Sequence, residues 1–242
     1  MEQFWIIVFL IFFGQLLGSL IGILKKPNAR FLKYSLAFAA AMMLGISLVE
    51  LIPEALSIAA PEFAVAGFIL GALSVVALDR LLPHIHPELC KTPGNMKRCV
   101  TMLVVGIGLH NIPEGLAIGI GFALDPGLGI MIALAIAVQD VPENVATIIP
   151  LYTLLRKRRT SFAVIIGTIL FELIGFLIGF FMLKEMPMAF LAGALGAAAG
   201  VMSFISIHEL LPGARLRENS FWKSVVMLLG LAIVLVMVLI FS

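Results

Sequence analysis

The sequence predicts an all-α polytopic membrane protein with eight transmembrane helices, and two observations support this prediction. Of the 242 residues, 62% are hydrophobic and 12% are charged, whereas soluble chains are roughly 45–50% apolar and about 25% charged. A membrane-spanning helix needs about 20 mainly apolar residues, and eight such stretches follow one another, at about 4–24, 35–58, 63–82, 99–123, 128–154, 162–183, 188–211 and 221–241. Because only short polar breaks separate them, residues 1–242 are expected to form a single transmembrane domain.

The first span is expected to remain in the protein. Glu2 precedes it, where a signal peptide would carry basic residues, and Lys25 and Lys26 follow it. No cleavage site of small residues comes after it, so the segment is interpreted as an uncleaved span.

The basic residues predict the orientation. Of the 16 Lys and Arg residues, 15 lie in or beside the connections between spans 1 and 2, 3 and 4, 5 and 6, and 7 and 8, and only Lys184 lies opposite. Positive charge is enriched in cytoplasmic loops. Both termini are therefore expected to be extracellular or periplasmic, and the protein is expected to lie in the cell inner (plasma) membrane.

The remaining composition does not indicate a disulfide-rich protein, a nucleic-acid-binding protein or a nucleotide-binding protein. Cys90 and Cys99 are the only cysteines, and they flank a polar loop without the pattern of a disulfide framework. No basic segment with interleaved aromatic residues predicts nucleic-acid binding, and no glycine-rich phosphate loop follows a strand pattern.

Small residues recur four positions apart within several spans, as in Gly14/Gly18/Gly22, Gly67/Gly71, Gly115/Gly119, Gly175/Gly179 and Gly196/Gly200. Such spacing is typical of closely packed transmembrane helices. A smooth surface on which one group of helices slides is the alternative, and the sequence does not separate the two.

Two near-copies of one polar motif lie in spans 4 and 5. They are His110-Asn111-Ile112-Pro113-Glu114-Gly115 and Gln139-Asp140-Val141-Pro142-Glu143-Asn144, which start 29 positions apart. Polar and ionisable groups at membrane depth are energetically costly and indicate a functional site.

Helical spacing predicts how each motif is presented. Residues three or four apart share a helix face, so His110, Asn111 and Glu114 align in one span, as do Gln139, Asp140 and Glu143 in the next. The proline in each motif removes a backbone hydrogen bond and is expected to kink or interrupt its helix. Because the two spans run in opposite directions, the motifs resemble halves of an inverted repeat that meet in mid-membrane.

Glu172, halfway along span 6, is expected to join the two motifs. With Glu114, Asp140 and Glu143 it would place a charge of −4 in the bundle, and no Lys or Arg lies at that depth. An unpaired buried ion costs several kcal/mol, so either protons or divalent cations must neutralise these groups. A mixture of histidine, carboxylate and amide ligands suits Zn²⁺ and related first-row ions, whereas Ca²⁺ and Mg²⁺ prefer oxygen alone.

A second polar set lies on the predicted cytoplasmic side. It comprises Asp79, His84, His86, His208 and Glu209. Solvated interfacial residues and a second metal site are both consistent with this set. Glu50 and Glu54, near the outer end of span 2, are likewise consistent with a structural or an entrance role.

The two core motifs, in successive spans of an eight-span chain, resemble those of the ZIP (Zrt/Irt-like) metal transporters, and the Gln-Asp form of the second motif is similar to the bacterial GufA-like branch. The resemblance implies a 3+2+3 inverted-repeat arrangement and a binuclear metal centre. It implies that His110, Glu114, Gln139 and Glu143 surround one metal, that Asn111, Asp140 and Glu172 hold the second, and that Glu114 and Glu143 bridge both. It also favours a cytoplasmic exit site for the second polar set.

The resemblance therefore predicts uptake of a divalent metal, chiefly Zn²⁺, into the cytoplasm by alternating access. The metal is expected as substrate and not as cofactor, and Cd²⁺, Fe²⁺, Mn²⁺ and Co²⁺ remain open as substrates, as does a homodimer. A cation/proton or cation/sodium exchanger of the inverted-repeat type is the alternative, but its oxygen-only sites fit His110 poorly. An intramembrane metalloprotease is excluded because His208-Glu209 lacks the second histidine of an H-E-x-x-H motif: position 212 is proline.

Overall fold

The computed structural model describes residues 2–25, 28–81, 96–214 and 221–241, and the regular elements in these ranges are all helices. In chain order they are α1 (Glu2–Lys25), α2 (Ala29–Gly45), η1 (Ile46–Leu51), α3 (Ile52–Ile58), α4 (Pro61–Leu81), α5 (Met96–Leu124), α6 (Pro126–Leu155), α7 (Arg158–Leu177), η4 (Ile178–Leu183), α8 (Met188–Ile205), η5 (Ser206–Leu210), α9 (Leu211–Gly213) and α10 (Phe221–Phe241).

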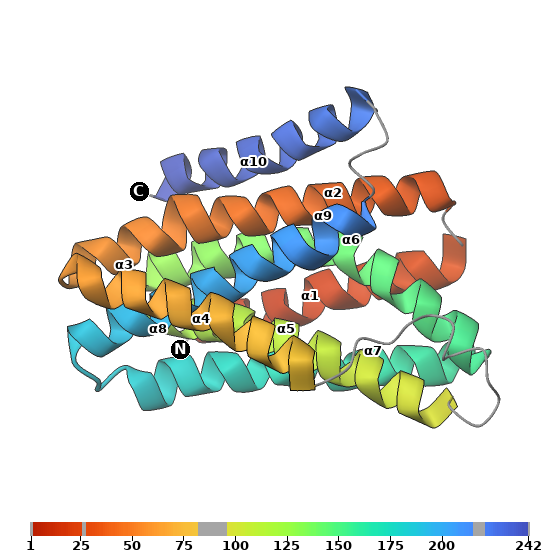
Figure 1. Ribbon diagram of the computed structural model, residues 1–242, viewed down its shortest axis with the longest axis horizontal. Coiled ribbons are helices and arrows are strands. Elements are labelled where there is room, and N and C mark those ends of the chain that lie inside the picture. The colour runs from red at the N-terminus through yellow and green to blue at the C-terminus, as the bar shows by residue number, and fades with distance from the viewer. Residues whose placement is uncertain (1, 26–27, 82–95, 215–220, 242) are drawn as a thin grey trace.

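Eight helical rods in the described part of the chain are long and apolar enough to cross a membrane. Five are single helices, and three contain a π-helical segment: Ala29–Ile58, Arg158–Leu183 and Met188–Gly213. The predicted all-α fold with eight membrane-crossing helices is confirmed. Both marked chain ends lie toward the same side of the bundle (Figure 1).

A tight turn between α5 and α6 makes the two motif-bearing helices antiparallel neighbours. α5 ends at Leu124, the side chain of Asp125 accepts a hydrogen bond from the backbone N–H of Leu128 at 2.9 Å, and Pro126 begins α6. An aspartate cap followed by proline is a strong helix start. Because the two helices then run side by side, both motifs lie at a similar depth.

The prolines of the two motifs do not interrupt their helices. α5 and α6 continue as α-helices through Pro113 and Pro142, so the expected interruption is wrong. Transmembrane helices tolerate proline because neighbouring helices and side chains compensate the freed backbone groups. The polar side chains of both motifs are consequently presented from continuous helices.

Two of the three π-helical segments lie at other prolines. The π-helical segments η1 and η5 each precede a proline within a shared pattern, S-x-x-E-L-x-P, at 47–53 and 206–212. In each, the buried serine hydroxyl donates to the carbonyl four residues earlier: Ser47 to Met43 at 2.7 Å and Ser206 to Met202 at 2.8 Å. A π turn adds one residue and relieves the clash between a proline ring and the preceding turn.

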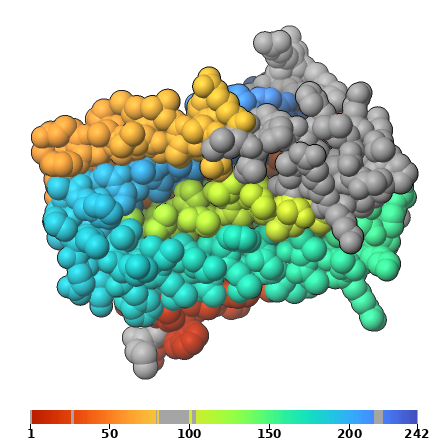
Figure 2. Space-filling view, turned by 60° about the horizontal axis from the view of Figure 1, so that its bottom comes forward, coloured from red at the N-terminus to blue at the C-terminus, as the bar shows by residue number. Residues whose placement is uncertain are grey.

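The helices pack in pairs, which we arrange in two groups, and contacts of α2 with α6 and of α5 with α8 join the groups. α1 packs on α6, α5 packs on both α6 and α7, and α1 also contacts α7. In the second group, α4 and α3 pack on α8, and α10 packs on α2. Figure 1 shows α10 at one edge of the bundle beside α2, and Figure 2 shows a face on which α7 lies along α5 and α4 lies along α8.

The glycine stripes join helices within each group. A Cβ atom added at Gly14 or Gly18 of α1 would collide with backbone of α6, at Ala137 or Val141. Corresponding collisions would occur between α5 and α7, at Gly115, Gly119, Gly175 and Gly179, and between α4 and α8, at Gly67, Gly71, Gly196 and Gly200. Backbones that approach this closely gain extensive van der Waals contact. The stripes are therefore sites of close packing.

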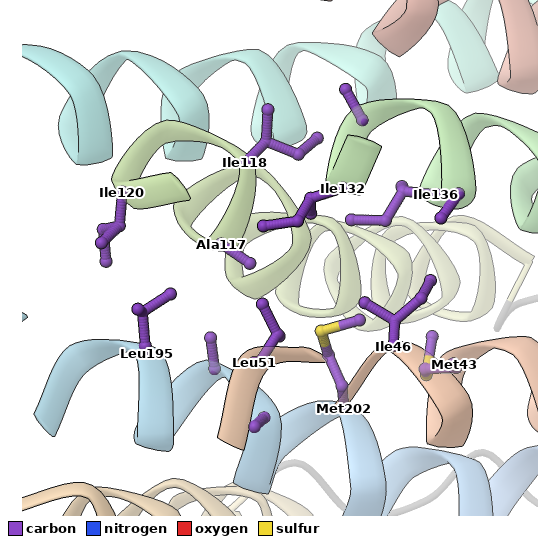
Figure 3. Packing of buried hydrophobic residues seen from close by; sticks show 14 of the residues in the cluster. Met43, Ile46, Leu51, Ala117, Ile118, Ile120, Ile132, Ile136, Leu195 and Met202 are labelled. Carbon is purple, nitrogen blue, oxygen red and sulfur yellow. The ribbon is translucent and has the colours of Figure 1, made fainter. Parts of the chain in front are cut away.

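A layer of larger apolar side chains separates the groups. Figure 3 shows Ala117, Ile132 and Ile136 of α5 and α6 facing residues of α2, η1 and α8, among them Met43 and Met202. All belong to one buried hydrophobic cluster. Apolar side chains of this cluster therefore fill the space between the groups.

Gly67→Ala is expected to lower the melting temperature of the detergent-solubilised protein. Its new methyl group would press on the carbonyl oxygen of Gly193 in α8, and overpacking typically costs about 1–3 kcal/mol. Gly167→Ala is the matched control because Gly167 is also helical and no atom lies within 4 Å of the position its Cβ would take. Equal melting temperatures for the two variants would contradict the assigned α4–α8 packing.

Candidate metal centre

Three helices bring the predicted core ligands together inside the first group. His110, Asn111 and Glu114 lie on α5, Gln139, Asp140 and Glu143 lie on α6, and Glu172 lies on α7. Six of these seven residues are buried, and the Glu143 side chain is 13% exposed. The regular α-helical spacing of both motifs, together with the α5–α7 contact at Gly115, determines this convergence.

The first half of the cluster contains His110, Glu114, Gln139 and Glu143. Ligand atoms of His110, Glu114 and Glu143 all lie within 4.8 Å of one another. The Nε2 atom of His110 is 3.3 Å from Oε1 of Glu143, and Nε2 of Gln139 donates to Oε1 of Glu114 at 2.6 Å. Four side chains from two helices therefore face a common point.

The second half contains Asn111, Asp140 and Glu172. The Nδ2 group of Asn111 donates to the backbone carbonyl of Thr168, one turn before Glu172 on α7, at 3.3 Å. The backbone of Glu172 lies against Gly115, which follows Glu114 on α5, and Asp140 follows Gln139 on α6. These interactions place the second half directly beside the first.

Several ligand atoms in the cluster have no hydrogen-bond partner among the described residues. They are His110 Nε2, Gln139 Oε1, Asp140 Oδ2, Glu143 Oε2 and Glu172 Oε1. His110 Nε2 is near Glu143, but the contact lacks the geometry of a hydrogen bond. Buried polar atoms are almost always paired, so five unpaired ligand atoms in one cluster indicate a site for a cation.

The charge of the cluster leads to the same conclusion. Four carboxylates are gathered here, and neither 99–155 nor 160–183 contains a Lys or Arg. Neutral amides donate to two of the carboxylates, but a hydrogen bond does not cancel a charge. In a low-dielectric surrounding the carboxylates need protons or divalent cations.

The structure adds one residue that the sequence analysis passes over. Gln15 of α1 is buried, donates through Nε2 to Oε2 of Glu172, and accepts at Oε1 from Nδ2 of Asn111 at 3.2 Å. The sequence signal for this contact was a polar amide between glycines in a mainly apolar span. A lone Gln in such a span more often forms a hydrogen bond that joins two helices. Its distance of 96 residues from Asn111 hides the contact in the sequence.

The second polar set is described only in part. His84 and His86 lie outside the described residues, and Asp79 lies in the last turn of α4, where its side chain is not described. His208 and Glu209 lie in η5 and are exposed, and the His208 ring stacks on Phe204 with centroids 5.1 Å apart. A joint site of the five residues therefore remains a prediction.

Glu50 and Glu54, in η1 and α3, are partly buried.

The fold and the cluster define a multi-pass membrane protein with a buried set of metal-ligand side chains. The family model described as ZIP Zinc transporter matches residues 91–238, which include both motifs and Glu172. The zinc transporter ZupT of Salmonella paratyphi A (strain ATCC 9150 / SARB42) is 36% identical over 211 residues, covering 82% of this chain and 81% of that protein. The protein of the same name from Salmonella newport (strain SL254) is similar to the same extent.

This chain belongs to the ZIP zinc transporter family. The predicted family is confirmed, and the protein is a transporter rather than an enzyme.

Glu143→Gln is expected to reduce the rise in melting temperature that Zn²⁺ produces in the purified protein. A ligand at 100 times its Kd stabilises a protein by about 2.7 kcal/mol, and the substitution removes a carboxylate that faces His110. Glu185→Gln is the matched control because Glu185 is exposed and lies 3.9 Å from Lys184, away from the cluster. If Glu143→Gln retained the full Zn²⁺-dependent shift, Glu143 would not be a ligand.

Proposed function

We propose that this protein takes up divalent metal, chiefly Zn²⁺, from outside the cell into the cytoplasm through a two-metal site in mid-membrane. The observation that carries the proposal is the buried cluster of unpartnered histidine, carboxylate and amide atoms on α5, α6 and α7. The two Salmonella relatives are both described as zinc transporters, which favours Zn²⁺ as the substrate of this chain.

The proposed site holds two ions. His110, Glu114, Gln139 and Glu143 bind the first, Asn111, Asp140 and Glu172 bind the second, and Glu114 and Glu143 bridge them. Two divalent cations would balance four carboxylates, which supports this stoichiometry. The contacts of His110 with Glu143 and of Gln139 with Glu114 support the composition of the first half.

Transport occurs by alternating access, with spans 1, 4, 5 and 6 moving against spans 2, 3, 7 and 8. Two packing features support this division. Backbone-to-backbone contacts at glycine unite α1 with α6, α5 with α7, and α4 with α8, so each group has rigid internal contacts. The layer between the groups consists of Ile, Met, Leu and Ala side chains (Figure 3), which can repack at moderate cost.

The proposed arrangement is a 3+2+3 inverted repeat with both termini outside the cytoplasm. The packing pairs support it: under a two-fold relation of spans 1–3 to 6–8, the α1–α6 pair corresponds to α7–α5, and the α4–α8 pair corresponds to α10–α2. The shared S-x-x-E-L-x-P pattern in spans 2 and 7 has the same relation. The excess of basic residues on one side supports the orientation in an inner membrane.

Metal flux into liposomes is expected to require the first half of the site. Purified protein in vesicles loaded with a zinc-sensing dye should give a signal when Zn²⁺ is added outside, and a His110→Ala/Glu143→Ala double variant should give only background. The double variant removes two of the three groups that share one 4.8 Å cluster. Wild-type vesicles without a metal-dependent signal, or an unchanged signal in the double variant, would refute the proposal.

The second polar set, Asp79, His84, His86, His208 and Glu209, is proposed as an exit site. A His208→Ala/Glu209→Ala variant is expected to slow transport while the affinity of the core for Zn²⁺ stays unchanged, because both side chains are exposed in η5 outside the buried cluster. A His84→Ala/His86→Ala variant should behave alike. Flux in vesicles and equilibrium Zn²⁺ binding in detergent measure the two quantities separately. An equal loss of core affinity would exclude a separate exit site.

A further inference from the structure

Gln15 makes two buried contacts with the second half of the cluster. Its Nε2 group donates to Oε2 of Glu172 on α7, and its Oε1 atom accepts from Nδ2 of Asn111 on α5 at 3.2 Å. It therefore contacts two of the three residues proposed to bind the second metal, from a third helix.

The two contacts determine which ligand atoms remain available. With one oxygen of Glu172 engaged by Gln15, the other, Oε1, has no hydrogen-bond partner. The Nδ2 group of Asn111 donates both to Gln15 and to the Thr168 carbonyl. Since that NH₂ has only two hydrogens, the amide orientation is settled and the carbonyl oxygen of Asn111 is turned away from both acceptors.

A comparison with Gln139 separates two roles for an amide in this cluster. Gln139 also donates to a carboxylate, at Glu114, but its own Oε1 atom has no partner. It is thus available as a ligand. The Oε1 atom of Gln15 is occupied by Asn111, so Gln15 acts on neighbouring ligands.

The backbone around Gln15 is closely packed. Gly14 and Gly18 on either side of it lie against the backbone of α6 at Ala137 and Val141, in contacts that leave no room for a Cβ atom. A buried side chain on such a backbone has little freedom, which is the condition under which supporting hydrogen bonds orient metal ligands.

We propose that Gln15 is a positioning residue for the second metal: it orients the Glu172 carboxylate and the Asn111 amide so that Oε1 of Glu172 and Oδ1 of Asn111 point at the ion. The role rests on the proposed two-metal function. It predicts an effect confined to the second half, because the hydrogen bonds of Gln15 go to Glu172 and Asn111, which both belong to that half.

Gln15→Leu tests the role because leucine has a similar volume and makes neither hydrogen bond. Zn²⁺ titration of the purified full-length protein by calorimetry, with the bound metal counted by elemental analysis, is expected to give two sites in the wild type. In the variant the affinity of one site should fall about 10–100-fold, the usual cost of losing a supporting contact, while the other changes little. Ser19→Ala, one turn along α1 at a buried hydroxyl without a hydrogen-bond partner, is the matched control and should retain both affinities.

A second variant covers the case in which Gln15→Leu does not fold. Gln15→Asn keeps the amide but is one methylene shorter, so it cannot span the distance to Asn111 and Glu172 together, and the same selective loss is expected. In a double-mutant cycle, adding Gln15→Leu to Glu172→Gln should weaken the second site less than it does in the wild type, because both changes act on one contact.

The outcomes distinguish this role from the function on which it rests. Wild-type protein that binds a single metal overturns the two-metal site and the role of Gln15 with it. Two sites in the wild type and unchanged affinities in the folded Gln15 variants overturn the role alone. A lower melting temperature with both affinities retained would assign Gln15 to helix packing only.

Discussion

The burial of four carboxyl side chains in the candidate metal centre is the constraint on which the rest of the structure depends. Glu114, Asp140 and Glu172 are almost completely buried and Glu143 is nearly so, and one uncompensated buried ion costs several kcal/mol. Neutral amides satisfy one oxygen each of Glu114 and Glu172, and other oxygens remain unpaired. Without basic partners at this depth, such a cluster must be neutralised by protons or by divalent cations, which is the basis of the proposed metal site.

Such a cluster needs a rigid support, and the glycine contacts supply it. α5 and α7 approach until Gly115 lies against the backbone of Glu172 itself, and α1 approaches α6 at Gly14 and Gly18. In lipid, apolar burial gives no driving force between helices, so close backbone packing is the main source of association. The same contacts that hold the bundle together therefore fix the distance between ligands on different helices. The apolar side chains in Figure 3 lie between these helices and the helices α2 and α8.

The eight long apolar helices and the convergence of the two polar motifs could be predicted from local sequence, because hydropathy and helical spacing are local properties. The expected interruption at Pro113 and Pro142 was wrong, since the tertiary surroundings decide whether a proline breaks a helix. Two of the three π-helical segments instead precede Pro53 and Pro212. Gln15 was missed for a different reason: its partners are 96 and 157 residues away, and only the packing of α1 against the motif helices brings them together.

The two halves of the cluster differ in chemistry, and this difference bears on metal preference. In the proposed division, the first half combines an imidazole with carboxylates and an amide, and the second offers oxygen atoms alone. Imidazole favours Zn²⁺ and its first-row neighbours, whereas an all-oxygen set accepts harder cations as well. Discrimination among metals would then reside mainly at His110, and the second half would contribute chiefly charge. Because Glu114 and Glu143 bridge the halves in this division, an ion in either half lowers the electrostatic cost of ionising the shared carboxylates, so the occupancy of each half depends on the other.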